Sequence, residues 1–187
     1  MAMRTFIAID LSPEIKARLA DFVGRLAPLG RGVKWVTKEA MHLTLKFLGE
    51  VDEARTAKIE SGLRSIAAKF NPITLTCQGA GAFPPGSPKP RVLWVGVEAG
   101  PDLALLQEDI ERFCEKIGFA REARPFHPHL TLGRVKAPAD IRAVLGEFDR
   151  ARADVFGRMI VQRLTFFRSQ LRPSGAEYSP LGEFSLQ

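Results

Sequence analysis

The stretch His-Leu-Thr-Leu occurs twice in this chain, at residues 42–45 and 129–132, and it contains two of the three histidines. In an extended strand successive side chains point to opposite faces, so histidine and threonine share one face and the leucines share the other. Each stretch therefore predicts a strand with its leucines towards a core. If the two strands lie side by side, both imidazoles and both hydroxyls line one groove.

A single histidine on a strand is often a hydrogen-bonded structural group. That explanation does not account for the repeat, because an apolar sheet needs leucine to alternate with any polar residue and has no need of histidine at a matched offset from threonine. We therefore expect His42 and His129 to share a chemical role.

Length and composition limit the alternatives. With 187 residues, 45% hydrophobic and 26% charged, the chain is long enough for a substantial core. Lys and Arg outnumber Asp and Glu by 27 to 21, which favours an anionic partner, although a net charge of +6 is also typical of proteins kept soluble by charge. Cys77 and Cys114 have no metal or redox spacing, so we expect reduced, buried thiols.

No apolar stretch approaches the roughly 18 residues of a membrane span, and the first apolar run is too short for a signal peptide. We expect a cytoplasmic protein that makes no membrane contact, with a monomer as the default state.

The order of elements predicts an α+β fold. Helices are expected after Ser12-Pro13, from about Asp52, over 103–117 and over 140–148. Strands are expected at 6–9, 33–36, 73–77, 92–97, 159–161, 164–167 and 178–186. The stretch 79–90, rich in Gly and Pro, is interpreted as a loop, either a substrate lip or a hairpin connection. Hairpin-like neighbours favour mainly antiparallel sheets.

The two motifs lie 87 residues apart, and each is followed by a turn and a helix, which indicates two related halves. We expect a single bilobal catalytic domain over residues 1–187, with two sheets flanked by helices. A central cleft between the lobes would place one motif on each wall.

Two imidazoles with pKa values of about 6.5 suit paired acid and base catalysis near neutrality. One accepts a proton from water while the other protonates a leaving oxygen, and threonine hydroxyls donate to the oxygens of an anion. A phosphodiester requires these groups. No carboxylate cluster is needed, so the site is expected to work without metal or cofactor.

The motifs around His42 and His129 resemble the paired His-x-Thr-x motifs of the two-histidine phosphoesterase superfamily, in particular its RNA 2′,3′-cyclic phosphodiesterases, also called 2′-5′ RNA ligases. The resemblance extends over nearly the whole chain. It includes the opening Arg-Thr-Phe-Ile-Ala-Ile, Trp-Val before the first motif, Phe-Leu-Gly after it, and Arg-Val-Leu-Trp between the motifs.

The resemblance implies hydrolysis of 2′,3′-cyclic phosphate RNA ends to 2′-phosphomonoesters, together with reversible 2′-5′ RNA ligation. It also implies that His42 donates a proton to the departing 3′-oxygen and that His129 activates water. Thr44 and Thr131 would hold the phosphate. The partners would be RNA 3′ ends or cyclic nucleotides.

The sequence leaves the roles of two residues near the second motif open. Arg134 can pair with phosphate, yet strict alternation puts it on the face opposite His129 unless Gly133 allows a bulge. His127 shares parity with His129, but Pro128 interrupts the strand, and we leave His127 out of the catalytic set.

Alternative functions also remain. The three histidines together are a possible zinc ligand set, which leaves the paired threonines unexplained. A non-catalytic RNA-end binding module would use basic side chains with Phe47 and Phe83 for stacking. Another cyclic or 2′-5′-linked nucleotide is a third possible substrate, because loops govern substrate choice.

Overall fold

The structure is a computed structural model, and it describes residues 2–136, 140–172 and 175–187. Nine strands in this part of the chain form two sheets, and all their pairings are antiparallel. Sheet A contains, in spatial order, β3 (His42–Asp52), β1 (Ala2–Asp10), β8 (Arg163–Arg172) and β9 (Gly175–Ser185). Sheet B contains β2 (Val33–Trp35), β6 (His129–Val135), β5 (Val92–Ala99), β4 (Ile73–Phe83) and β7 (Val155–Val161).

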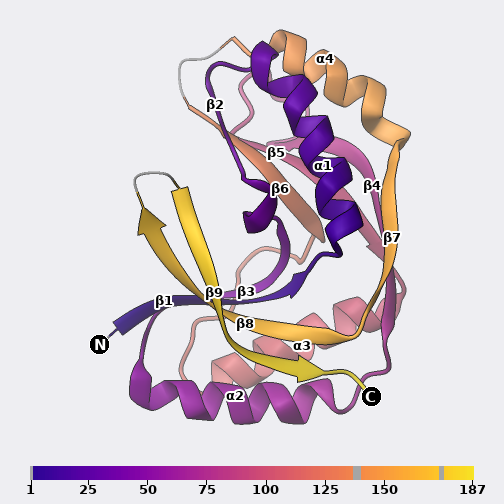
Figure 1. Ribbon diagram of the computed structural model, residues 1–187. Helices are drawn as coiled ribbons and strands as arrows, with labels where there is room; N and C mark the ends of the chain where they lie inside the picture. Colours follow the sequence, from indigo (N-terminus) through magenta and orange to yellow (C-terminus); the bar gives the residue numbers. More distant parts are fainter. Residues whose placement is uncertain (1, 137–139, 173–174) are drawn as a thin grey trace.

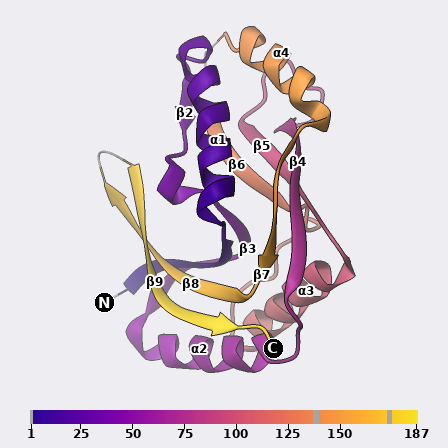
Figure 2. The ribbon, with the colours of Figure 1, turned by 45° about the vertical axis from the view of Figure 1, so that its right-hand side comes forward.

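Helices cover the outer faces of both sheets (Figure 1 and Figure 2). Helices α1 (Pro13–Leu26) and α4 (Arg142–Arg150) lie against sheet B, whereas α2 (Glu53–Ala67) and α3 (Pro101–Lys116) lie against sheet A. Short 3-10 helices occur at Ala27–Leu29 (η1), Lys38–Ala40 (η2) and Ala151–Ala153 (η3). The predicted α+β architecture, with two antiparallel sheets flanked by helices, is confirmed.

Helices α1 and α2 begin where the sequence indicates, and a side chain caps the first turn of each. The hydroxyl of Ser12 accepts a hydrogen bond from the Ile15 amide at 3.4 Å, and Pro13 occupies the first helical position. In α2 the Asp52 carboxylate accepts from the Arg55 amide at 3.0 Å. The apolar side chains that recur at helical spacing are buried, namely Ile15, Leu19, Phe22, Val23 and Leu26 in α1, and Ile59, Leu63 and Ile66 in α2.

The two halves of the chain repeat one arrangement. The first runs β1–α1–β3–α2 with β2 inserted before β3, and the second runs β5–α3–β6–α4. In each half the motif strand pairs antiparallel with the strand that precedes the intervening helix. Helix α1 follows a strand of sheet A but packs on sheet B. Helix α3 follows a strand of sheet B but packs on sheet A (Figure 1). The two lobes are therefore interlocked.

The prediction of a loop over residues 79–90 is wrong for 79–83. Strand β4 continues through these residues, and the connecting loop covers only 84–91. Gly81 lies under the Trp94 ring, and a Cβ atom at Gly81 would come within 2.4 Å of that ring. The glycine thus serves close packing within a strand rather than a turn, which is why composition alone misled the prediction. Of the two alternatives for the loop, the hairpin connection is the observed topology.

Candidate active site

The two motif strands meet where the sheets adjoin, with β3 at the edge of sheet A and β6 beside the short edge strand of sheet B. Their leucines are buried as predicted, with at most 3% exposure at Leu43, Leu45, Leu130 and Leu132. The histidines and threonines of both motifs are only partly buried. The alternation of faces that the tetrapeptide predicts is therefore present in both strands.

Both catalytic candidates make the same hydrogen bond to their own chain. Nδ1 of His42 lies 2.9 Å from the carbonyl oxygen of Ala40, and Nδ1 of His129 lies 2.7 Å from the carbonyl oxygen of His127. A carbonyl oxygen can only accept, so Nδ1 carries the hydrogen in each ring. In the neutral ring Nε2 therefore has the free lone pair, and each motif fixes the tautomer by the same local contact.

His42 is surrounded by aromatic side chains of sheet A. Its ring stacks on Phe6 with centroids 4.6 Å apart, meets the edge of Tyr178 at 5.1 Å, and lies 6.2 Å from Phe167. Burial lowers the pKa of His42 to about 4, while its carbonyl hydrogen bond and nearby Asp10 oppose that shift. His42 is consequently neutral at pH 7 in the unliganded protein.

His129 has a more open environment. Its ring meets Phe83 in an edge contact with centroids 5.2 Å apart, and Phe83 in turn packs on Trp94 at 5.1 Å. The side chain of His127 is exposed, and this residue contributes its backbone carbonyl to the site. The structure thus keeps His127 outside the pair of imidazoles.

The motif threonines occupy equivalent positions in their strands. Thr44 lies opposite Ala8 of β1, and Thr131 lies opposite Trp94 of β5. Within the described part of the chain neither hydroxyl has a hydrogen-bond partner. Both hydroxyls are therefore free to donate to a ligand on the motif face.

A β-bulge decides where Arg134 points. Thr131 pairs with Trp94, but Gly133 pairs with Leu93, so β6 contains one extra residue at Leu132. The bulge restores Arg134 to the face of Thr131, which regular alternation would not do. The alternative that sequence left open is therefore resolved in favour of the motif face.

Arg134 also connects the two lobes electrostatically. Burial raises the pKa of Tyr178, and the positive charges of Arg134 and Arg4 oppose this shift. Tyr178 contacts His42. The positive charge of Arg134, which belongs to sheet B, therefore acts on a side chain that packs against the first motif.

Sequence reasoning missed the aromatic residues around His42, namely Phe6, Phe167 and Tyr178. They come from β1, β8 and β9, and only sheet pairing brings them to the histidine. No local spacing could have signalled this contact.

A pocket of about 210 Å³ opens beside His42. Its polar lining includes three carboxylates, from Asp10, Glu39 and Glu183, together with Lys16. Lys16 pairs with Asp10 at 2.6 Å, and Glu183 pairs with Arg163 at 2.9 Å. This end of the site therefore offers no unpaired cation among the residues that line it in the described structure.

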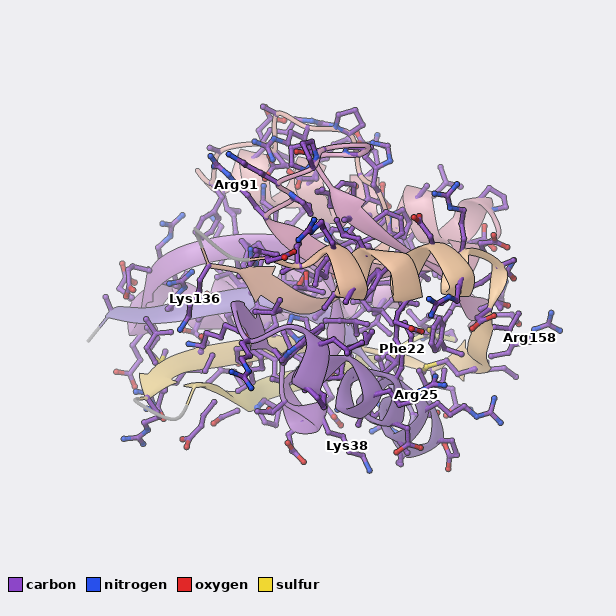
Figure 3. All side chains as sticks on the ribbon, turned by 90° about the horizontal axis from the view of Figure 1, so that it is seen from above. Phe22, Arg25, Lys38, Arg91, Lys136 and Arg158 are labelled. Atoms are coloured by element: carbon purple, nitrogen blue, oxygen red, sulfur yellow. The ribbon has the colours of Figure 1, made fainter. Side chains whose placement is uncertain are left out.

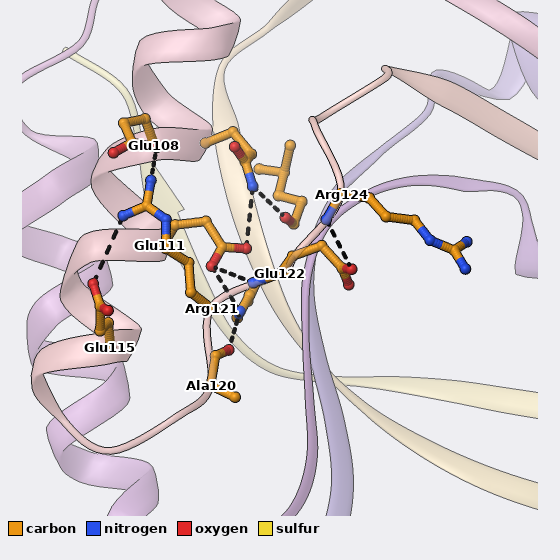
Figure 4. A network of polar contacts seen from close by, with 10 residues as sticks. Glu108, Glu111, Glu115, Ala120, Arg121, Glu122 and Arg124 are labelled. Carbon is orange, nitrogen blue, oxygen red and sulfur yellow. Dashed lines mark hydrogen bonds and ion pairs between the residues drawn. The ribbon is translucent and has the colours of Figure 1, made fainter.

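A buried ion pair joins the first motif strand to the segment that leads to the second motif. Lys46 of β3 donates to Glu111 of α3 and to the carbonyl oxygen of Ala120, both at 2.7 Å. The same carboxylate accepts from the Glu122 amide at 3.3 Å, and Gln107 donates to its second oxygen (Figure 4). The two side chains of the ion pair are only 4% and 5% exposed.

A bulge places this lysine as well. Thr44 pairs with Ala8 but Lys46 pairs with Ile7, so β3 has an extra residue at Leu45. Lys46 consequently turns away from the motif face and towards the helices of sheet A.

Metal coordination requires several donor side chains in one place. Across residues 2–136, 140–172 and 175–187 no three His, Cys, Asp or Glu side chains are grouped as metal ligands. The three-histidine zinc site is not assembled by these residues. In the same ranges no helix is long and apolar enough to cross a bilayer.

Both cysteines are free and buried, as predicted. Burial raises the pKa of each thiol to about 12.

Comparisons with solved structures give the same fold. The crystal structure of TT0787 from Thermus thermophilus superposes with a TM-score of 0.84 at 32% identity and covers 98% of both chains. E. coli LigT complexed with 3′-AMP superposes with a TM-score of 0.75 at 28% identity, over 100% of this chain and 99% of that one.

Sequence relatives agree with the structural neighbours. A Thermotoga maritima protein named RNA 2′,3′-cyclic phosphodiesterase is 37% identical over 182 residues, which are 97% of this chain and 94% of the relative. An Archaeoglobus fulgidus protein of the same name is 36% identical over 184 residues, or 97% and 99% of the two chains. Residues 11–172 match the family described as the 2'-5' RNA ligase superfamily. With this match and these relatives, the chain belongs to the 2'-5' RNA ligase superfamily.

Proposed function

We propose that this protein hydrolyses 2′,3′-cyclic phosphate ends of RNA to 2′-phosphomonoesters by metal-independent catalysis with His42 and His129. The observation that carries the proposal is the matched pair of Nδ1–carbonyl hydrogen bonds, which leaves Nε2 of both rings for proton transfer. The names of the Thermotoga and Archaeoglobus relatives support the choice of substrate.

In the proposed reaction a water oxygen attacks phosphorus while the bond from phosphorus to the 3′-oxygen breaks. Nε2 of His129 takes the proton from water, and Nε2 of His42 gives a proton to the departing 3′-oxygen. The phosphate stays on the 2′-oxygen. When the 5′-hydroxyl of a second RNA attacks in place of water, the same two proton transfers produce a 2′-5′ phosphodiester, and this ligation is reversible.

The remaining groups stabilise the phosphate. Thr44 and Thr131 donate hydrogen bonds to its non-bridging oxygens, and Arg134 balances the negative charge that develops there. Free hydroxyls on the motif face, and the bulge that turns Arg134 to the same side, support these assignments.

The proton donor role of His42 requires a proton that the unliganded ring lacks at neutral pH, because its pKa is about 4. A bound phosphate anion favours the imidazolium and raises that pKa. Substrate binding therefore brings the proton onto His42.

Because both motif strands and all five assigned side chains belong to one chain, the site is complete in a monomer. We propose that the protein acts as a cytoplasmic monomer on RNA 3′ ends.

The decisive experiment incubates an RNA oligonucleotide ending in a 2′,3′-cyclic phosphate with the protein in excess EDTA. Comparison of the product with synthetic 2′- and 3′-phosphate standards should show only the 2′-phosphate, and dialysis against chelator should leave the rate unchanged. A 3′-phosphate product or a chelator-sensitive rate would contradict the mechanism. Binding without turnover would favour an RNA-end binding module instead.

A further inference from the structure

Four directly paired residues span four neighbouring strands of sheet B. Lys34 of β2 pairs with Arg134 of β6, Arg134 pairs with Val92 of β5, and Val92 pairs with Phe83 of β4. Residues directly opposite one another in a sheet project from the same face. Since the ring of Phe83 contacts the ring of His129, Lys34 lies on the face of the second motif.

Lys34 and Arg134 are like charges in directly opposed positions. Both side chains are exposed, and within the described ranges neither forms an ion pair. Like charges opposite each other destabilise a sheet. An anion bound between them removes this repulsion.

Two further cations lie at the same end of the sheet. Lys136 follows β6 by one residue, and Arg91 precedes β5, with its carbonyl oxygen accepting from the Val135 amide at 2.9 Å. Figure 3 shows Arg91 and Lys136 projecting on the same side of the molecule. We call Lys34, Arg91, Arg134 and Lys136 the basic row.

The end of the site beside His42 is acidic rather than basic. In the lining of the pocket beside His42, Lys16 pairs with Asp10, and Glu183 pairs with Arg163, which is not itself a lining residue. Glu39 adds another negative charge to this lining. A polyanion lying along this lining would meet three carboxylates, and the lysine among the lining residues is already paired.

We propose that the RNA strand on the 5′ side of the cyclic phosphate leaves the active site across the basic row, with one upstream phosphate held by Lys34, next to the reacting phosphate at Arg134. This inference rests on the proposed function and deepens it, because it makes an RNA chain, rather than a cyclic mononucleotide, the preferred substrate. Lys34 lies level with Arg134 and one strand, about 5 Å, from the motif strand. It therefore contacts a nucleotide upstream of the reacting one.

The test compares wild type with Lys34→Glu on two substrates, a nucleoside 2′,3′-cyclic monophosphate and an oligonucleotide with the same cyclic end. The ratio of kcat/KM for the oligonucleotide to that for the mononucleotide should fall about fivefold to tenfold in the variant, and the change should lie in KM. Lys34→Gln should give a smaller fall. The matched control is Lys58→Glu, because Lys58 is exposed on α2, which lies at the other end of the molecule, and should leave the ratio unchanged.

Salt dependence gives a second readout. For the oligonucleotide, the slope of log KM against log salt should decrease by about 0.7 in Lys34→Glu, the value for one phosphate contact on a single strand. The variant should melt no lower than wild type, since it replaces a like-charge pair with an opposite-charge pair. An unchanged ratio, or an equal loss on both substrates, would overturn the proposed exit path.

A binding measurement separates this inference from the proposed function. Fluorescence anisotropy of a labelled oligonucleotide ending in a 2′-phosphate needs no turnover, and its affinity should weaken in Lys34→Glu but not in Lys58→Glu. Equal affinities in Lys34→Glu and Lys58→Glu would overturn the proposal that RNA binds across the basic row. Absence of turnover in wild type, with the binding difference retained, would instead refute the hydrolytic function.

Discussion

The two motifs share a tetrapeptide and a hydrogen bond but differ in their surroundings. His42 is packed among three aromatic rings of sheet A, and burial lowers its pKa to about 4. In the described chain His129 contacts one aromatic ring, that of Phe83, on a more open face. The tetrapeptide therefore fixes the tautomer and orientation of each imidazole, whereas the aromatic surroundings in sheet A lower the affinity of His42 for protons.

The largest expected effect comes from removing either imidazole. His42→Ala and His129→Ala should each lower kcat by about 10² to 10⁴, because each ring performs one proton transfer. The losses should not add in the double variant, since acid and base act in one transition state. Steady-state kinetics with circular dichroism as a fold check measures this.

The third histidine supplies the control for that comparison. His127→Ala keeps the carbonyl that orients His129 and removes only an exposed imidazole, so activity should stay near that of wild type. Turnover within tenfold of wild type in either motif variant would rule out the assigned roles.

Breaking the buried ion pair between the first motif strand and helix α3 should have the next largest effect. Lys46→Met leaves the Glu111 carboxylate buried without its cation, and this should lower the free energy of unfolding by about 3 to 5 kcal/mol. Lys69→Met, which removes an exposed pair with Asp109, should cost less than about 1 kcal/mol. Urea denaturation compares the two, and equal costs would show that burial adds nothing to the importance of the Lys46 pair.

The unequal burial of the histidines also predicts a pH dependence of stability. The folded pKa of His42 is about 4, below the value of 6.5 for a free imidazole, so between these pH values the unfolded state binds more protons. Stability from this group is complete above pH 6.5 and is lost as the pH falls towards 4, by on the order of 3 kcal/mol.

His42→Gln isolates this contribution, because glutamine does not titrate. Unfolding free energies at several pH values should show a shallower loss in His42→Gln than in wild type. Identical slopes in wild type and His42→Gln would mean that His42 is not desolvated in the folded protein.

The smallest expected effect concerns the pH dependence of the reaction itself. The profile of kcat/KM reports the free enzyme, and that of kcat reports the complex. Because bound phosphate raises the pKa of His42, the alkaline limb of kcat should lie at higher pH than the alkaline limb of kcat/KM. Coincident limbs, or no alkaline limb, would argue against His42 as the proton donor.

Sequence alone determined the fold class, the capped helices and the two motif faces, because these depend on local periodicity and on side chains a few residues apart. The Ser12 cap, the start of α2 near Asp52 and the buried leucines followed from that logic. The repeated tetrapeptide likewise identified His42 and His129 as candidates without any knowledge of the sheet order.

Tertiary structure decided what depends on register and on distant strands. Single extra residues at Leu45 and Leu132 turn Lys46 away from the motif face and return Arg134 to it, and strict alternation predicts neither. Tyr178 reaches His42 only through the pairing of four strands. A bulge or a contact across a sheet depends on packing between segments far apart in the chain, so local sequence could not fix the charge at the two ends of the site.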